Sequence, residues 1–239
     1  LRLSSNNPVT YIAEPWTRTT QLAMSGPGHG GHSMYMYFYL NGIYQGLINP
    51  VERPDAWFAS TYFGGEFEDY FAVNHHELSW RGNHYLSGDP NSYELLLEIA
   101  EQKQLEEPAN YELFRQLCDI TQFADYTILY WYSGFGDGVD NNYYAFMRPE
   151  TLDGNTAIGL KYYIWDAEFC FSERGGPPGN SVPWVPGYYF SKDEPISRIW
   201  QALYENSDFR MLFADRVYKH CFHDGALTDA AAQRRWDIL

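Results

Sequence analysis

The chain has 239 residues, of which 45% are hydrophobic and 18% aromatic, and its 31 acidic and 16 basic side chains give a formal net charge of −15. This composition excludes an intrinsically disordered chain, and the acidic balance argues against nonspecific nucleic-acid binding, which depends on basic patches. No apolar run approaches the roughly 18 residues of a membrane span, and the spacing of Cys118, Cys170 and Cys221 indicates neither a disulfide framework nor a zinc site.

The first thirty residues predict short elements followed by a glycine-rich loop. Residues 1–5 read as a strand, and residues 17–24 read as a short helix with Thr17 or Thr19 as its cap. Residues 26–32 contain two histidines, but their glycines fit neither the Walker spacing nor the protein-kinase spacing. We therefore interpret this segment as a loop.

A β-hairpin is the strongest local prediction. Residues 33–40 and 43–51 are apolar runs joined by Asn41-Gly42, and both turn positions tolerate the positive φ that a tight hairpin requires. We expect this hairpin at the centre of a sheet. Pro54 then starts a helix over residues 56–63.

After a further strand at residues 69–74, the sequence changes to helical spacing. Leu95 and Leu113 are expected on the apolar faces of the first two helices. The predicted helices cover residues 92–102, a segment that starts at Pro108, and residues 120–132, 195–204, 208–221 and 228–236. The change of period predicts an α+β fold, with an antiparallel sheet in the N-terminal part and a mainly helical C-terminal part.

Residues 131–171 contain the candidate chemistry. Asp137 and Asn142 have the Asp-x-x-x-x-Asn spacing of a kinase catalytic loop, in which the Asp accepts the substrate hydroxyl proton and the Asn holds Mg²⁺. A predicted hairpin then leads to Asp166, where a kinase has a second magnesium ligand. Mg²⁺ prefers such oxygen donors. The spacing alone favours an ordinary polar turn over a metal site, because Asp and Asn beside Gly are common turn residues.

Several segments together resemble the CotH kinase family, the spore coat protein H-like atypical kinases of bacteria. The resemblance covers about residues 1–239, and its most specific parts are the hairpin that leads to Glu52-Arg53-Pro54-Asp55 and the pair formed by Asn141-Asn142 and Trp165–Glu168. The matching segments are YLNGIYQGL (39–47), VERPDAWFASTYFGGEFEDY (51–70), DGVDNNYYAFMRP (137–149), YIWDAEFCF (163–171) and NSDFRMLFADRVYKHCFHDGALT (206–228).

The resemblance implies a single kinase-like domain over residues 1–239, truncated at its N-terminus, with a sheet-rich small-lobe part (1–74) and a helical large-lobe part (75–239). It implies ATP–Mg²⁺ phosphotransfer to protein Ser/Thr hydroxyls, with a basic protein substrate suited to the acidic chain. It also implies a spore-coat, cell-surface or secreted location. The implied roles are Asp137 as catalytic base, Asn142, Asp166 and Asn141 as metal ligands, and Asp140 and Glu168 as supporting groups.

The nucleotide contacts follow from the same resemblance. Glu52 and Arg53 occupy the expected hinge between lobes, although they could equally form a salt bridge at a helix start. The kinase lysine that pairs with the phosphates has no counterpart before Lys103. Either it precedes the first residue given, or Arg2 takes its place.

Two other functions remain open from the sequence. The chain could be a catalytically inactive kinase-like module that binds or supports part of a larger surface or envelope protein, as the missing lysine favours. It could also be a glycoside hydrolase that uses two of the carboxylates of Glu52, Asp137, Asp166 and Glu168.

Overall fold

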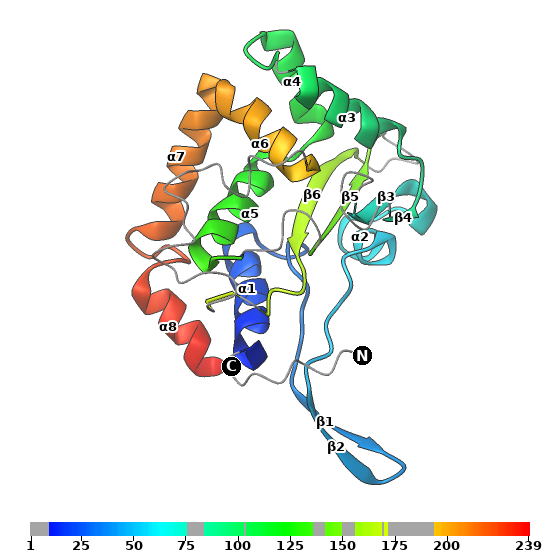
Figure 1. Cartoon of the computed structure of the whole chain (residues 1–239), viewed down its shortest axis with the longest axis vertical. Coiled ribbons are helices and arrows are strands. Elements are labelled where there is room, and N and C mark those ends of the chain that lie inside the picture. The colour runs from blue at the N-terminus through cyan, green and yellow to red at the C-terminus, as the bar shows by residue number, and fades with distance from the viewer. Residues whose placement is uncertain are drawn as a thin grey trace.

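The computed structural model of the chain describes residues 10–75, 84–102, 104–135, 142–149, 156–168, 170–171 and 194–239. Figure 1 shows a body of helices packed around a sheet, with a β-hairpin that extends away from the body. The predicted α+β fold is confirmed, with antiparallel strand pairing and a helical C-terminal part. The strand expected at residues 1–5, with Arg2, lies outside the described residues.

The body is built on a four-stranded antiparallel sheet of order β4-β3-β5-β6. The strands are β3 (Phe71–His75), β4 (His84–Ser87), β5 (Tyr143–Arg148) and β6 (Ile158–Ile164). The strand predicted at 69–74 begins two residues later, because Phe67–Asp69 form a short 3-10 helix. The predicted hairpin that follows residue 142 is present as β5 and β6, and β6 is an edge strand of the sheet.

The Asn41-Gly42 hairpin forms as predicted, from β1 (Met36–Leu40) and β2 (Ile43–Ile48). Both turn residues have positive φ, 50° for Asn41 and 80° for Gly42. The expected central place in a sheet is wrong, because among the described strands β1 and β2 pair only with each other and form a separate two-stranded sheet. β5 and β3 take the central positions of the main sheet instead.

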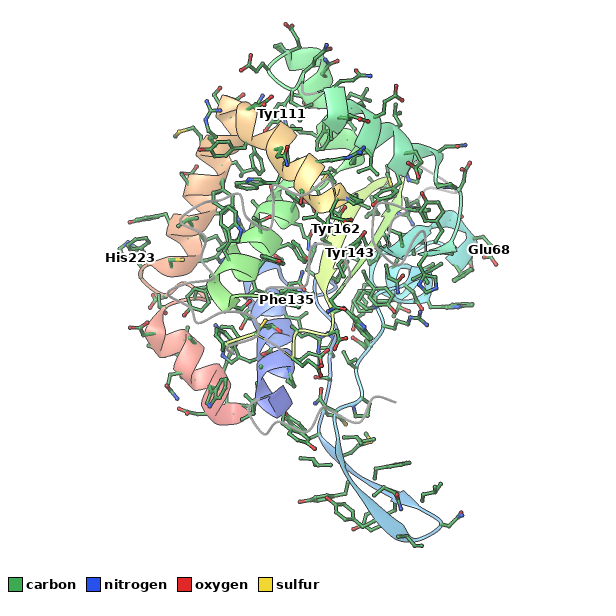
Figure 2. The ribbon with its side chains drawn as sticks, viewed as in Figure 1. Glu68, Tyr111, Phe135, Tyr143, Tyr162 and His223 are labelled. Carbon is green, nitrogen blue, oxygen red and sulfur yellow. The ribbon has the colours of Figure 1, made fainter. Side chains whose placement is uncertain are left out.

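Helices cover both faces of the main sheet. They are α1 (Thr10–Ser25), α2 (Ala56–Phe63), α3 (Asn91–Gln102), α4 (Pro108–Leu117), α5 (Ile120–Ser133), α6 (Pro195–Glu205), α7 (Ser207–Cys221) and α8 (Asp229–Ile238). On one face, Tyr143 and Tyr162 lie side by side in the larger core, with ring centroids 5.5 Å apart, and α5 packs on them (Figure 2). On the other face, Phe58 of α2 packs on Phe146 and Tyr163.

The core faces of α3 and α4 include the predicted Leu96, Ala100, Phe114 and Leu117, but not Leu95 or Leu113. Leu95 is 43% exposed and Leu113 is 40% exposed. In α3 the buried stripe runs through Tyr93, Leu96, Leu97 and Ala100, so Leu95 falls on the solvent side of the helix. In α4 the same geometry buries the tyrosine at position 111 and leaves Leu113 outside.

Helix α1 starts at Thr10, seven residues before the predicted start, and contains Pro15. A proline cannot donate a hydrogen bond to the carbonyl four residues earlier. Here that carbonyl belongs to Tyr11, and it accepts a hydrogen bond from the hydroxyl of Tyr35 instead. The external donor satisfies the freed acceptor and lets the helix continue through Pro15. Thr17 is therefore interior and bonds back to the Glu14 carbonyl (2.8 Å).

None of the described helices is both long and apolar enough to cross a bilayer. The three cysteines are free thiols, two of them buried and Cys221 partly buried. Burial raises the pKa of the Cys118 thiol far above its ordinary value, which makes it unreactive.

A buried ionic cluster ties α1, α5 and α7 together around Asp125, which is 1% exposed. Arg216 donates to both of its carboxylate oxygens at 2.7 and 2.5 Å, His220 Nε2 lies 2.8 Å from one of them, and Ser25 donates at 2.8 Å. Burial alone would raise the pKa of the Asp125 carboxyl, but the hydrogen bonds from His220 and Arg216 outweigh it and lower that pKa.

The first prediction concerns this cluster. A carboxyl whose pKa is lower in the folded chain than in the unfolded chain stabilises the fold. This contribution is fully present when the pH is above the unfolded pKa of about 3.9. It is lost as the pH falls through the folded pKa. We expect Asp125→Asn to reduce the free energy of unfolding by about 3 kcal/mol near neutral pH. The difference between wild type and variant should shrink below about pH 4.

Urea unfolding followed by circular dichroism, repeated across this pH range, checks the prediction. A difference that stays constant to about pH 3 would show that the charge of Asp125 does not contribute.

Candidate functional site

The ends of β5 and β6 bring two candidate metal ligands to one place. Tyr143 pairs with Ile164, so Asn142 immediately before β5 and Asp166 shortly after β6 emerge at the same end of the hairpin. Asn142 is 7% exposed. Asp166 has a left-handed backbone, with φ of 57°. The structure therefore brings together the two described residues that the sequence assigned to Mg²⁺.

The loop that contains Asp137 joins this end of the sheet to α5. Helix α5 ends at Gly134 in the left-handed conformation, and Phe135 after it is 1% exposed. Residues 136–141, with Asp137 and Asn141, lie outside the described residues. Their two neighbours in the sequence, Phe135 and Asn142, are both buried. The amide of Phe171 also donates to the Ser133 carbonyl (2.9 Å), which holds the segment after Asp166 beside the end of α5.

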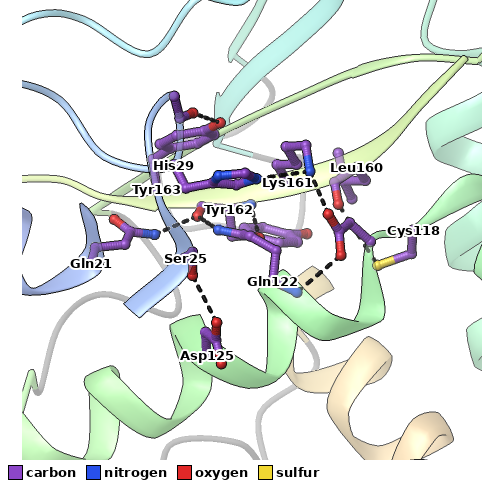
Figure 3. Close-up of polar contacts among 12 residues, drawn as sticks. Gln21, Ser25, His29, Cys118, Gln122, Asp125, Leu160, Lys161, Tyr162 and Tyr163 are labelled. Carbon is purple, nitrogen blue, oxygen red and sulfur yellow. Dashed lines mark hydrogen bonds and ion pairs between the residues drawn. The ribbon is translucent and has the colours of Figure 1, made fainter. Parts of the chain in front are cut away.

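The outer edge of β6 is covered by side chains from two helices (Figure 3). Gln122 of α5 accepts from the Tyr162 amide (2.9 Å) and donates to its carbonyl (2.5 Å). Gln21 of α1 donates to the same carbonyl (2.8 Å) and accepts from the Ile164 amide (3.1 Å). Among the described strands, only β5 pairs with β6, so these glutamines take the place of a further strand.

The same pattern continues past the strand to Asp166. Its amide donates to Glu14 Oε1 at 3.2 Å. Arg18, one turn further along α1 and 2% exposed, pairs with that carboxylate oxygen at 2.5 Å. The Arg18 guanidinium also donates to Asn49 (2.6 Å) and Ser33 (3.3 Å), which flank the β1–β2 hairpin. Burial lowers the pKa of Arg18, against the effect of Glu14, which raises it.

Arg53 reaches the same end of the sheet. Its Nε donates to the Tyr144 hydroxyl (2.9 Å), and its guanidinium lies 5.4 Å from the centre of that ring. Tyr144 follows Asn142 by two residues, and Trp165 packs edge-on against its ring at 4.8 Å. Arg53 is also 4.0 Å from Asp55, the N-cap of α2, so the alternative of a helix-start ion pair is present in weak form.

Glu52 is held by a different set of groups. Its carboxylate accepts from the amide of His32 (2.9 Å) and from the hydroxyl of Tyr62 (3.0 Å). Burial alone would raise the pKa of Glu52, but the bonds from His32 and Tyr62 outweigh it and lower that pKa. These contacts tie the glycine-rich loop to α2, so Glu52 and Arg53 are directed to different partners.

The donor chemistry at the hairpin end fits Mg²⁺. Asn142 and Asp166 offer an amide and a carboxylate oxygen, and Glu168, 8% exposed, follows on the same segment. Within the described residues, no group of three or more His, Cys, Asp or Glu side chains is arranged to hold a metal ion. Mg²⁺ is commonly held by one or two carboxylates together with waters and substrate phosphates, so a smaller protein set is compatible with it.

A second polar cluster lies in a cleft of about 710 Å³ that the beginnings of α5 and β6 help to line. Lys161 is 6% exposed, pairs with Asp119, and lies 3.1 Å from His29 Nε2. Burial and the charge of Lys161 lower the pKa of His29, so its neutral ring can accept from the ammonium group. Packing here is close, because a Cβ on Gly159 would lie 2.8 Å from the Asp119 amide.

Sequence reasoning missed the residues that hold β6 in place. Glu14, Arg18, Gln21 and Ser25 recur at intervals of four, three and four, which places them on one face of α1. The signal was present as a polar stripe in a segment rich in apolar residues. It could not be separated from an ordinary solvent-facing stripe, because its partners lie up to 152 residues further along the chain.

Comparison with protein-family models gave no match for this chain, and a search of curated proteins gave none either.

The second prediction concerns the Lys161–Asp119 pair. Asp119→Asn keeps an acceptor at the N-cap of α5 but leaves the buried ammonium group without its counter-charge. We expect it to lower the free energy of unfolding by about 3 kcal/mol. Asp119→Asn combined with Lys161→Met should recover most of that loss, because the buried charge is then removed.

Chemical denaturation of the single and double variants measures both effects. A double variant as unstable as Asp119→Asn would show that the loss does not come from the unpaired charge of Lys161.

Proposed function

We propose that this protein is an ATP–Mg²⁺ phosphotransferase that acts on Ser or Thr hydroxyls of a protein, as its resemblance to the CotH kinases implies. The observation that carries the proposal is the pairing of Tyr143 with Ile164, which presents Asn142 and Asp166 at one end of the β5–β6 hairpin. The Asp137 loop leads directly into Asn142. In a kinase, the base precedes one metal ligand by this spacing in the sequence, and a hairpin leads to the second ligand.

In the proposed reaction, Asp137 acts on the acceptor hydroxyl, and the other residues bind the metal ion. Asp137 orients the acceptor hydroxyl and takes its proton. Asn142 and Asp166, with Asn141 beside them in the sequence, would hold Mg²⁺, which supplies charge neutralisation between the phosphates. Positioning and electrostatic stabilisation provide most of the rate in phosphoryl transfer, so the buried position of Asn142 and the contact of the Asp166 amide with Glu14 support the proposal.

Arg53 is the described cation best placed for the nucleotide. Its side chain is about half exposed (52%), and its guanidinium rests on Tyr144, beside the candidate metal ligands. It therefore has open donors for a phosphate or an adenine edge. Glu52 keeps its proposed role as a nucleotide contact only if a ligand displaces Tyr62 or His32 from its carboxylate. Arg2 remains the other proposed phosphate contact.

One observation favours the alternative, a kinase-like module that binds or supports part of a larger surface or envelope protein. The β1–β2 hairpin exposes large apolar side chains, including Tyr37 (72%) and Ile43 (66%). No charged residue occurs between Ser33 and Val51. Exposed apolar surface of this kind is typical of interaction sites. Nucleotide binding distinguishes the two functions.

The third prediction is that ATP with Mg²⁺ stabilises the protein. A ligand that binds only the folded state, at a concentration about a hundred times its dissociation constant, adds about 2.7 kcal/mol and raises the melting temperature. Asp166→Ala should abolish most of this shift, because it removes a carboxylate that holds the metal. Differential scanning fluorimetry with ATP, with Mg²⁺ and with both provides the measurement.

No shift in the wild-type protein would favour the binding module over the phosphotransferase. Lys219→Ala, a change on α7 away from the hairpin end, serves as the control variant and should keep the full shift.

The fourth prediction separates catalysis from binding. Asp137→Ala should reduce phosphate transfer by roughly 10²- to 10⁴-fold, the usual contribution of a general base. Its affinity for ATP and Mg²⁺ should change little, because this group faces the acceptor hydroxyl. Transfer of radiolabelled phosphate to a generic basic protein, with calorimetric titration of nucleotide, measures the two effects. Equal loss of nucleotide binding in Asp137→Ala and Asp166→Ala would mean that Asp137 is a metal ligand or a structural turn residue.

A further inference from the structure

We infer that Glu14 is a positioning residue for Asp166: its carboxylate fixes the left-handed backbone from which the Asp166 side chain projects. The inference rests on the proposed function, because it assumes that Asp166 holds a metal ion. It adds a residue from α1, 152 positions earlier in the chain, to a site otherwise described at the ends of β5 and β6.

The backbone of Asp166 is in a conformation that needs support. Its φ of 57° is one of four positive values among the described non-glycine residues. Side chains other than glycine adopt this region at a cost in energy, and such residues persist where their surroundings determine them. The amide of Asp166 donates to Glu14 Oε1 at 3.2 Å, so Glu14 supplies a direct contact to the strained residue.

Glu14 is itself held in place from several directions. Arg18 pairs with the same oxygen, Oε1, at 2.5 Å, and Arg18 is almost completely buried. Its donation to Asn49 and Ser33 locks the guanidinium against the segments that flank the β1–β2 hairpin. A carboxylate with one fixed oxygen and a buried cation beside it has little freedom to rotate. The acceptor that meets the Asp166 amide is therefore preorganised.

Gln21 provides an internal comparison on the same helix. It accepts from the amide of Ile164 at 3.1 Å, as Glu14 accepts from that of Asp166. Gln21 thus accepts from Ile164, the last residue of β6, which has regular strand geometry. Glu14 accepts from Asp166, whose side chain is the proposed metal ligand. Loss of either contact exposes one amide of the same segment. Only the loss of Glu14 releases the backbone of Asp166.

The consequence for the metal is geometric. A carboxylate ligand has to remain within about 0.5 Å of its productive position. Without the Glu14 acceptor, residue 166 can relax toward a right-handed or extended backbone, and its carboxylate then moves relative to Asn142. Partners that orient a metal ligand typically change metal affinity by roughly 10- to 100-fold when they are removed.

The test compares Glu14→Ala, Glu14→Gln and Gln21→Ala. Mn²⁺ serves as the probe, titrated into each protein with ATP present and followed by its paramagnetic resonance signal. We expect Glu14→Ala to weaken Mn²⁺ binding by roughly 10- to 100-fold. Glu14→Gln keeps an acceptor oxygen and should remain within about threefold of wild type, while Gln21→Ala should lower the melting temperature but leave Mn²⁺ affinity unchanged.

Each contrary result has a distinct meaning. If wild type binds Mn²⁺–ATP and Glu14→Ala binds it equally well, the inference is overturned and the proposed function stands. Equal weakening by Glu14→Ala and Gln21→Ala, or by Glu14→Ala and Glu14→Gln, also overturns it, because general edge stability or the charge would then be the cause. If wild type itself binds no Mn²⁺–ATP, the proposed function fails, and the inference fails with it.

Discussion

The unpaired edge of β6 is the constraint on which the arrangement of α1, α5 and the candidate site depends. Buried amides without a partner each cost about 1–3 kcal/mol. At Tyr162, Ile164 and Asp166 the partners are side-chain oxygens from Gln122, Gln21 and Glu14. At Leu160 the carbonyl accepts from the backbone amide of Asp119 (3.1 Å). Two helices are thus aligned along one strand, and the last contact in the row holds the residue proposed to bind metal.

The two ends of β6 have opposite electrostatic character. At its beginning, the charge of Lys161 is already balanced by Asp119, and a neutral imidazole completes the contacts of the ammonium group. At its far end, oxygen donors gather at Asn142 and Asp166, and Arg53 rests on a ring beside them. The ammonium group of Lys161 already has Asp119 as its counter-charge, whereas oxygen donors are the ligands that Mg²⁺ prefers. This contrast is why the far end carries the functional proposal although the cleft near Lys161 is roomy.

Local signals predicted the local structure well. Asn41-Gly42 gave the turn, Pro108 and Pro195 mark the first turns of α4 and α6, and the aromatic run after Ile120 is a buried helix.

The predictions that failed depended on partners far along the chain. The β1–β2 hairpin was expected inside a sheet because its residues are apolar, and nothing local reveals that its edges pair with no other strand. Helix α1 was expected to start after Pro15. The hydroxyl of Tyr35, which satisfies the freed Tyr11 carbonyl, lies 24 residues along the sequence, so the local sequence does not reveal it. Asn142 and Asp166 were expected together, but the role of Glu14 required knowledge of how α1 docks.

The position of α1 has a consequence for how the protein is made. This helix leaves the ribosome before all the strands, yet Gln21 meets Tyr162 across 141 residues, and Trp16 donates to the carbonyl of Ala232 across 216. Its buried polar face, with Arg18 and Glu14, therefore stays in contact with water, and its apolar side has no surface to cover until residues far along the chain have been made. Contacts this distant close slowly, because the loop entropy has to be overcome first. A nascent chain that exposes such a helix for so long is a natural client for chaperones that shield emerging segments.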